Sequence, residues 1–290
     1  MRDSLALKKN SAKEGYVPRR ISTDRFRCAA IAGGVLLALG LAAPILAADR
    51  LNDKDVKQLI DRMDSERDRF EDQLDGKLKR SIIRGPRGEV DVERYLDDLQ
   101  ENMDKLKGRF NPTYAASAEV TTVLQQGSAI QRYMSTLPPN FDGASEWNRL
   151  AASLGELASS YGTALPLPQG QQARRLNDGE VKKTAEALAK NADAYKKQLD
   201  SSLKKDKTID KATREASLKD ADILKEDAKK VASLVADGKP ASGEVKALFQ
   251  QVSAVQGAQK GRNLSPDALT AWGAMQGDLA KISQAFGIAR

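Results

Sequence analysis

The sequence repeats itself at a fixed offset of 125 residues. Short motifs recur at this offset without gaps, and each copy contains one of the only two tryptophans in the chain. Chance explains this poorly, because one offset aligns both tryptophans and both ends of the unit. The sequence therefore predicts one structural unit written twice, at residues 51–162 and 176–287. The matched segments are 50–53 with 175–178, 73–75 with 198–200, 119–120 with 244–245, 125–126 with 250–251, and Trp147 with Trp272.

Both copies open with the same helix start signal. Asn52 and Asn177 are suitable N-cap residues, and an acidic residue follows each of them three positions later. A leucine lies directly before each cap and a valine lies four residues after it, which is the spacing of a hydrophobic staple. The first helix of each unit is therefore predicted to begin at this motif.

Apolar residues then recur in steps of three and four, which indicates amphipathic helices. Four such stripes fit each unit, separated by Pro, Gly and Asn breakers. Gly162 and Gly287 follow the last stripe in each copy and are predicted C-cap glycines. In the first copy the four stripes are Val56, Ile60, Met63, Phe70, Leu74, Leu78; Val92, Tyr95, Leu96, Leu99, Met103, Leu106, Phe110; Val120, Leu124, Ile130, Met134; and Trp147, Leu150, Leu154, Leu157, Tyr161.

The predicted fold is all-α, with two tandem antiparallel four-helix bundles that arose by internal duplication. Residues 163–175 between them are rich in Pro and Gln and are predicted to form a short, semi-stiff linker. Two alternatives remain open. One is a continuous eight-helix array, and the other is a pair of three-helix units with a bent long helix.

Residues 1–48 have the order of a secretory signal. A basic stretch ends at Arg27, an apolar run follows over residues 29–43, and small residues precede Asp49. Cleavage is predicted after Ala48 or one residue earlier. The alternative is an uncleaved anchor over residues 29–48, which has about the length needed to span a bilayer. The predicted location is periplasmic or secreted, and the alternative is the inner membrane through that anchor.

Removal of the leader changes the charge argument. The chain has 47 basic and 40 acidic residues, and the first 48 residues hold 8 and 3 of them, so the remainder has a net charge of +2. The pI of about 9.3 thus derives largely from the leader, and a nucleic-acid role is not predicted. Residues 51–162 carry a net charge of −4 and residues 176–290 carry +4. Opposite charges favour docking of the two repeats or head-to-tail self-association of chains.

The amino-acid alphabet also limits the chemistry. The chain has no histidine, and its single cysteine, Cys28, lies in the leader. The commonest general base, a thiol nucleophile and the usual haem and zinc ligands are therefore missing after cleavage. No cofactor, no metal site and no catalytic residue are predicted.

One row of acids is a candidate cation site, because steps of three and four place its members on one helix face. The second copy breaks this row, with Ala189 and Lys197 at two of the matching positions, so a solvated charged face is the preferred interpretation. The basic clusters 204–207 and 229–230 and the two tryptophans are likewise interpreted as a charged face and as core residues. The acidic row is Asp61, Asp64, Asp68, Asp72 and Asp75.

One loop differs in kind between the copies. Residues 81–88 combine two isoleucines, two arginines and a Gly-Pro turn, whereas residues 206–213 are mostly polar. The loop is a candidate contact surface at a bundle tip, and the alternative is a connector whose isoleucines tuck under the bundle. The predicted partner-contact residues are Ile82, Ile83, Arg84 and Arg87.

Three function classes follow from these observations. The leading hypothesis is a non-enzymatic interaction or scaffold protein of the cell envelope with a protein partner. A helical ligand-binding or sensory module is the second hypothesis. A carboxylate-based hydrolase ranks last, because no paired acids occupy corresponding inward positions in both units.

Overall fold

The computed structural model describes residues 50–85, 88–260, 262 and 264–288. Over these residues the protein is all-α apart from one β-hairpin, and all of them belong to one compact unit. The elements are α1 (Asp53–Gln73), α2 (Gly76–Lys79), β1 (Ile82–Gly85), β2 (Gly88–Asp91), α3 (Val92–Arg109), α4 (Ser117–Met134), α5 (Ala144–Ser160), α6 (Asp178–Lys205), α7 (Lys211–Ala236), α8 (Ser242–Gln259) and α9 (Pro266–Ala285).

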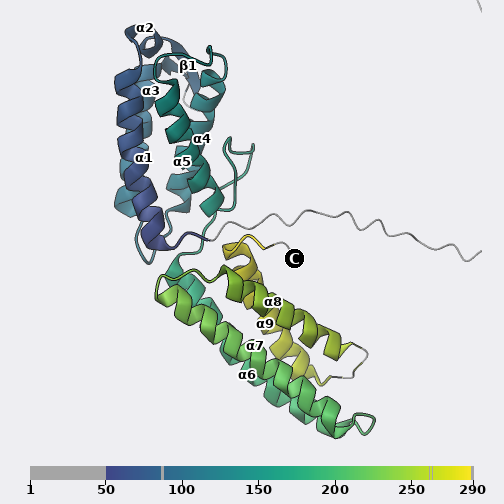
Figure 1. Cartoon of the computed structure of the whole chain (residues 1–290). Coiled ribbons are helices and arrows are strands. Elements are labelled where there is room, and N and C mark those ends of the chain that lie inside the picture. The colour runs from purple at the N-terminus through teal and green to yellow at the C-terminus, as the bar shows by residue number, and fades with distance from the viewer. Residues whose placement is uncertain (1–49, 86–87, 261, 263, 289–290) are drawn as a thin grey trace, which may run out of the picture. The chain divides into compact units, whose positions relative to one another are not determined.

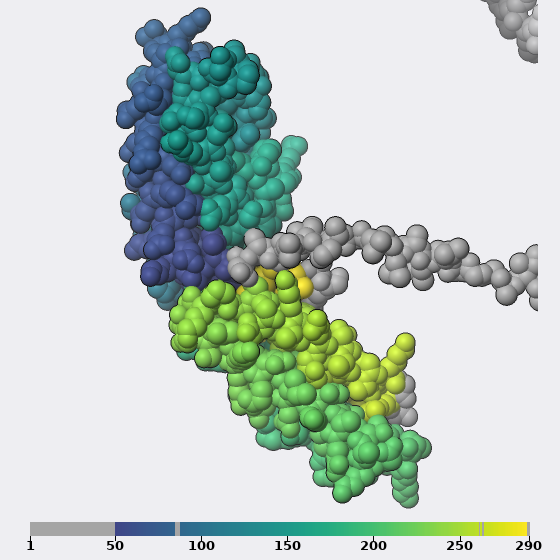
Figure 2. All heavy atoms as spheres, viewed as in Figure 1, coloured from purple at the N-terminus to yellow at the C-terminus, as the bar shows by residue number. Residues whose placement is uncertain are grey.

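The helices form two groups, each with a separate hydrophobic core. The first helix group contains α1 to α5 and the hairpin, and the second contains α6 to α9. Within each group the helices lie side by side (Figure 1), and side chains fill the space between the ribbons (Figure 2). Each core includes one tryptophan in contact with one ring of the group's first helix. The centroids of Phe70 and Trp147 are 5.4 Å apart, as are those of Tyr195 and Trp272.

The predicted helix starts are confirmed in both groups. The side chain of Asn52 accepts a hydrogen bond from the Asp55 amide, and that of Asn177 accepts one from the Glu180 amide. Glu180 also accepts a hydrogen bond from the Asn177 amide, which completes a capping box.

The predicted apolar stripes form the two cores. Almost every stripe residue of the first copy is buried, and only Leu78 is half-buried at the edge of the core. Gly162 and Gly287 have φ angles of +66° and +61° just after α5 and α9, as expected for C-cap glycines. The two tryptophans are 4% and 8% exposed, which confirms that they are core residues.

The first helix of the first group is shorter than the stripe predicts. The stripe continues to Leu78, but α1 ends at Gln73, and Asp75 caps the separate short helix α2. Asp75 accepts hydrogen bonds from the amides of Lys77 and Leu78, and Gly76, a poor helix former, follows it. In the second group the corresponding residues continue α6 to Lys205.

No described helix has the length and apolar character needed to cross a membrane. The predicted signal peptide and its alternative, an anchor over residues 29–48, lie outside the described residues and stay predictions.

Candidate functional site

The loop predicted to contact a partner forms an antiparallel hairpin at one end of the first helix group, next to α2 (Figure 1). Ile82 pairs with Asp91, Ile83 with Val90, and Arg84 with Glu89. Because side chains alternate between the two faces of a strand, Ile82 and Arg84 share one face and Ile83 lies on the other.

The two isoleucines have different environments. Ile83 is 2% exposed and belongs to the first core, so it is not available for contact with a partner. Ile82 is 60% exposed, the highest exposed fraction among the large hydrophobic side chains of the described residues. The predicted contact surface therefore fits the exposed Ile82, and the alternative, a connector whose isoleucines lie under the bundle, fits the buried Ile83.

The arginines of the hairpin are also separated in role. Arg84 forms an exposed ion pair with Glu89 on the opposite strand, which holds its side chain along the hairpin surface. Arg87 lies outside the described residues. The surface available at the tip thus combines one apolar side chain, Ile82, with the ion pair of Arg84 and Glu89, in which the two charges balance.

The tip of the second helix group has no strand among its described residues. Asp206 accepts hydrogen bonds from the amide and hydroxyl of Thr208, and Asp210 caps α7 through the amide of Thr213. These local bonds lower the pKa values of both carboxyls. Each aspartate therefore organises a tight polar turn, and the only isoleucine of this turn, Ile209, is half-buried against the second core.

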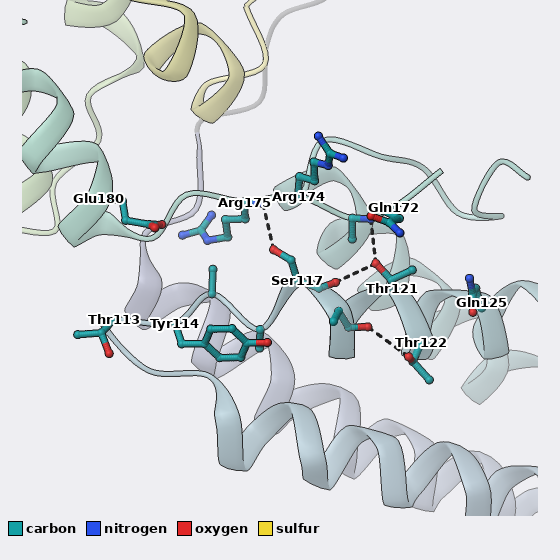
Figure 3. Close-up of a pocket in the computed structure, with 14 residues that line it drawn as sticks. Thr113, Tyr114, Ser117, Thr121, Thr122, Gln125, Gln172, Arg174, Arg175 and Glu180 are labelled. Atoms are coloured by element: carbon teal, nitrogen blue, oxygen red, sulfur yellow. Dashed lines mark hydrogen bonds between the residues drawn. The ribbon is translucent and has the colours of Figure 1, made fainter. Parts of the chain in front are cut away.

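Residues 163–175, predicted as a semi-stiff linker, lie along α4. Three hydroxyls on one face of α4 accept backbone hydrogen bonds from this segment: Ser128 from Leu167 at 2.7 Å, Thr121 from Ala173 at 3.0 Å, and Ser117 from Arg175 at 3.3 Å. Figure 3 shows the last two hydroxyls facing the segment. Leu165 and Leu167 pack against the first core, so this stretch is attached to the first helix group rather than free between two domains.

A groove of about 660 Å³ opens beside this attachment. Figure 3 shows its lining, in which Ser117, Thr121, Thr122 and Gln125 follow one another along α4, with Tyr114 at one end of this row and Arg174 on the segment beside it. Tyr114 donates a hydrogen bond to Glu119, and this bond raises the pKa of Tyr114. The polar lining residues include Tyr114, Thr121, Thr122, Gln125, Gln172 and Arg174.

The acidic row does not form a metal site among the described residues. Lys107 forms ion pairs with Asp61 and Asp64, Arg67 pairs with Asp68, and Asp75 caps α2. The first four acids are thus exposed or half-buried charged residues of α1, as the interpretation of a charged helix face expects, whereas Asp75 lies beyond the end of α1.

The basic clusters are engaged in the same way. Lys204 pairs with Asp200 on α6, and Lys229 and Lys230 pair with Glu226 and Glu244. These contacts fit a charged surface and give no isolated basic patch at these three lysines.

Sequence reasoning missed the α4 groove and the hydroxyls that hold residues 163–175. A signal was present, because Ser117, Thr121 and Ser128 are spaced four and seven residues apart and so share a helix face. This pattern is polar, so the apolar periodicity that predicts the helices does not reveal it. No family model, curated protein or solved structure matches this chain.

Proposed function

We propose that the protein is an exported, non-enzymatic interaction or scaffold protein of the cell envelope. In this proposal it consists of two tandem four-helix bundles that arose by duplication, and it contacts a protein partner through the hairpin of the first bundle. The duplication is supported by equivalent roles at the 125-residue offset, such as the caps Asn52 and Asn177 and the aromatic pairs around Trp147 and Trp272.

The observation that carries the contact proposal is the exposure of Ile82. An isoleucine left 60% exposed on a strand loses more than half of its burial, which when complete is worth about 1.5–3 kcal/mol. The buried neighbour Ile83 and the ion pair of Arg84 and Glu89 hold this side chain at the tip. The tip lies beyond the end of α1, whose 21 residues span about 30 Å, so it can reach a partner away from the start of the helix.

The test is a photo-crosslinking residue placed at position 82 in living cells. We expect a discrete crosslinked protein from this position and none from position 269, because Leu269 is similarly exposed, at 54%, but lies on α9. A crosslink of equal strength from both positions, or no crosslink from position 82, would contradict the proposal.

A second variant separates binding from folding. Ile82→Thr keeps a β-branched residue in the strand but removes most of its apolar surface. We expect it to abolish capture of the partner found by crosslinking, with a free energy of unfolding within about 0.5 kcal/mol of the wild type.

The alternative is a helical ligand-binding module, and the α4 groove favours it. Its volume lies in the range of small-molecule sites, and several polar side chains converge on it. In this case Arg174→Ala and Gln125→Ala would weaken the binding of a small molecule that raises the melting temperature of the wild type. Recovery of a tightly bound small molecule together with no protein partner would favour this function over the first.

A further inference from the structure

The two helix groups meet through residues that occupy corresponding places in the two copies. The α1 amide of Asp53 donates a hydrogen bond to the Asp178 carboxylate at 2.7 Å. In return, the α6 amide of Asp178 donates one to the Asp53 carboxylate at 2.8 Å. Each aspartate is the first residue of its helix, so each helix supplies an acceptor for an amide that the start of a helix usually leaves to water.

Two arginines complete the exchange. Arg175 donates to Asp53 at 2.8 Å and to the Leu51 carbonyl at 2.7 Å. Arg50 donates to Asp178 at 2.5 Å and to the Leu176 carbonyl at 2.7 Å. Both guanidinium groups are nearly buried, with side-chain exposures of 1% and 6%.

The surroundings of the arginines are also reciprocal. Arg175 lies over the ring of Tyr161 and Arg50 over the ring of Phe286, at 6.0 and 5.7 Å from the ring centroids. The backbone amide of Arg175 donates to the Ser117 hydroxyl, and that of Arg50 donates to the Ser242 hydroxyl. Every one of these residues has its counterpart 125 positions along the chain.

The chemistry of the cluster explains why it needs both groups. The starts of α1 and α6 are positive ends of helix dipoles, and two arginines add two further positive charges. The carboxylates of Asp53 and Asp178 neutralise the arginines and accept from the helix amides. Removing one carboxylate in the joined state would take the nearest acid partner from a buried guanidinium, which is a destabilising change.

We infer that Arg50, Asp53, Arg175 and Asp178 form a reciprocal latch that locks the two helix groups in one mutual arrangement. The latch is a conformational device: it is built from one half in each repeat, and it fixes the orientation of the hairpin relative to the second group. The inference does not depend on a partner for the hairpin, because it concerns only contacts within the chain. The inference assigns a role to Arg50 and Arg175, which helix capping alone does not explain.

The test measures the distance between spin labels on the two groups. Labels at Asp72→Cys on α1 and Lys205→Cys on α6, in the full chain with Cys28→Ser, place one label on an exposed position of each group. The wild-type latch predicts a narrow distance distribution. Asp53→Ala combined with Asp178→Ala is expected to broaden it at least about twofold, because both carboxylates that accept hydrogen bonds from the other group are lost.

A matched control removes a helix cap that lies within one group. Asp210→Ala deletes the acceptor for the Thr213 amide at the start of α7 and does not touch the latch. We expect lower stability with an unchanged distance distribution. If the wild-type distribution is already broad, or if the double variant is as narrow as the wild type, the latch does not lock the groups.

A milder pair of variants keeps the inference testable if the aspartate variant folds poorly. Arg50→Lys with Arg175→Lys preserves both positive charges but loses the planar, two-pronged donor geometry. It is expected to broaden the distribution less than the aspartate variant, with unchanged helix content by circular dichroism. Asp53→Ala alone should broaden it more than Asp53→Ala with Arg175→Leu, because the second change removes a buried guanidinium that has lost its nearer acid partner and keeps only Asp178, at 3.9 Å. The opposite order would exclude charge pairing as the locking interaction.

Discussion

The tips of the two helix groups differ far more than their cores do. In the first group, α1 ends at Gln73 and the chain forms α2 and a hairpin before α3, whereas in the second group α6 runs to Lys205 and α7 begins at Lys211. The same alignment that matches the cores therefore covers a hairpin in one copy and a polar turn in the other. This contrast teaches that the two groups have equivalent caps and aromatic core pairs at the 125-residue offset, while the ends of their first helices differ.

The third helices differ in a related way. Ser128 of α4 is buried beneath residues 163–175, whereas the corresponding Ser253 of α8 is exposed. The preceding residue is Gly127 in the first group and Val252 in the second, and Val252 is 7% exposed. Gly127 thus lies where residues 163–175 approach α4. On α8 no described segment approaches the corresponding position, and the side chain of Val252 fills that space.

The largest expected effect tests whether the cores are equivalent. Trp147→Ala and Trp272→Ala each remove a buried ring that contacts the first helix of its group. Each is expected to lower the free energy of unfolding by about 3–5 kcal/mol, as for other buried aromatic residues. Denaturant titration of both variants measures this. A loss below about 1 kcal/mol in only one variant would break the equivalence of the two cores.

A smaller effect tests the contrast between α4 and α8. A Cβ atom at Gly127 would lie 2.9 Å from Leu154 Cδ1 and 3.6 Å from Leu165 Cδ1. Gly127→Val is therefore expected to cost about 1–3 kcal/mol through overpacking, and to displace residues 163–175 from α4. Denaturant titration and hydrogen exchange at the Leu167 amide measure the two effects.

The reciprocal variant serves as the control. Val252→Gly is also expected to destabilise, because it removes a nearly buried side chain and no neighbouring segment replaces it. A gain in stability from Gly127→Val, with the Leu167 amide still protected, would show that the glycine is not required by the linker.

The smallest effect concerns the ring that pairs with each tryptophan, which is Phe70 in one group and Tyr195 in the other. Burial raises the pKa of Tyr195 to about 12, although Gln259 donates a hydrogen bond to its hydroxyl. The raised pKa means that stability is fully present below about pH 10, the ordinary tyrosine value, and is lost as pH rises from about 10 to 12. The slope is at most about 1.4 kcal/mol per pH unit for this one group.

Tyr195→Phe gives the second group the residue type of the first. It is expected to cost about 0.5–1.5 kcal/mol at pH 7, because the hydrogen bond from Gln259 is lost, and to reduce the alkaline loss of stability. Free energies of unfolding at pH 9 and pH 11 measure both effects. An alkaline loss as steep in the variant as in the wild type would assign that loss to other groups.

Part of the candidate site could be predicted from the sequence. The difference between residues 81–88 and 206–213 identified the tip at which the two groups differ, because a mismatch at the 125-residue offset can be read from the sequence alone. The separate fates of Ile82 and Ile83 could not be predicted, since they depend on the strand register that places one side chain in the core. The hydroxyls of α4 and the course of residues 163–175 were missed because hydrogen bonds between distant segments leave no periodic signal.

The sequence by itself determined the helical class, the caps at Asn52 and Asn177 and the apolar stripes that make up most of the first core. These features depend on local propensity and on the spacing of apolar residues, and both are properties of short stretches of chain. Only the tertiary structure decided that Arg50 and Asp53 contact the start of α6 while Arg175 and Asp178 contact the start of α1. Arginine and aspartate residues at a helix start can cap that helix locally or join it to another helix. Which of the two they do depends on whether their buried charged groups contact partners about 125 residues away in the chain.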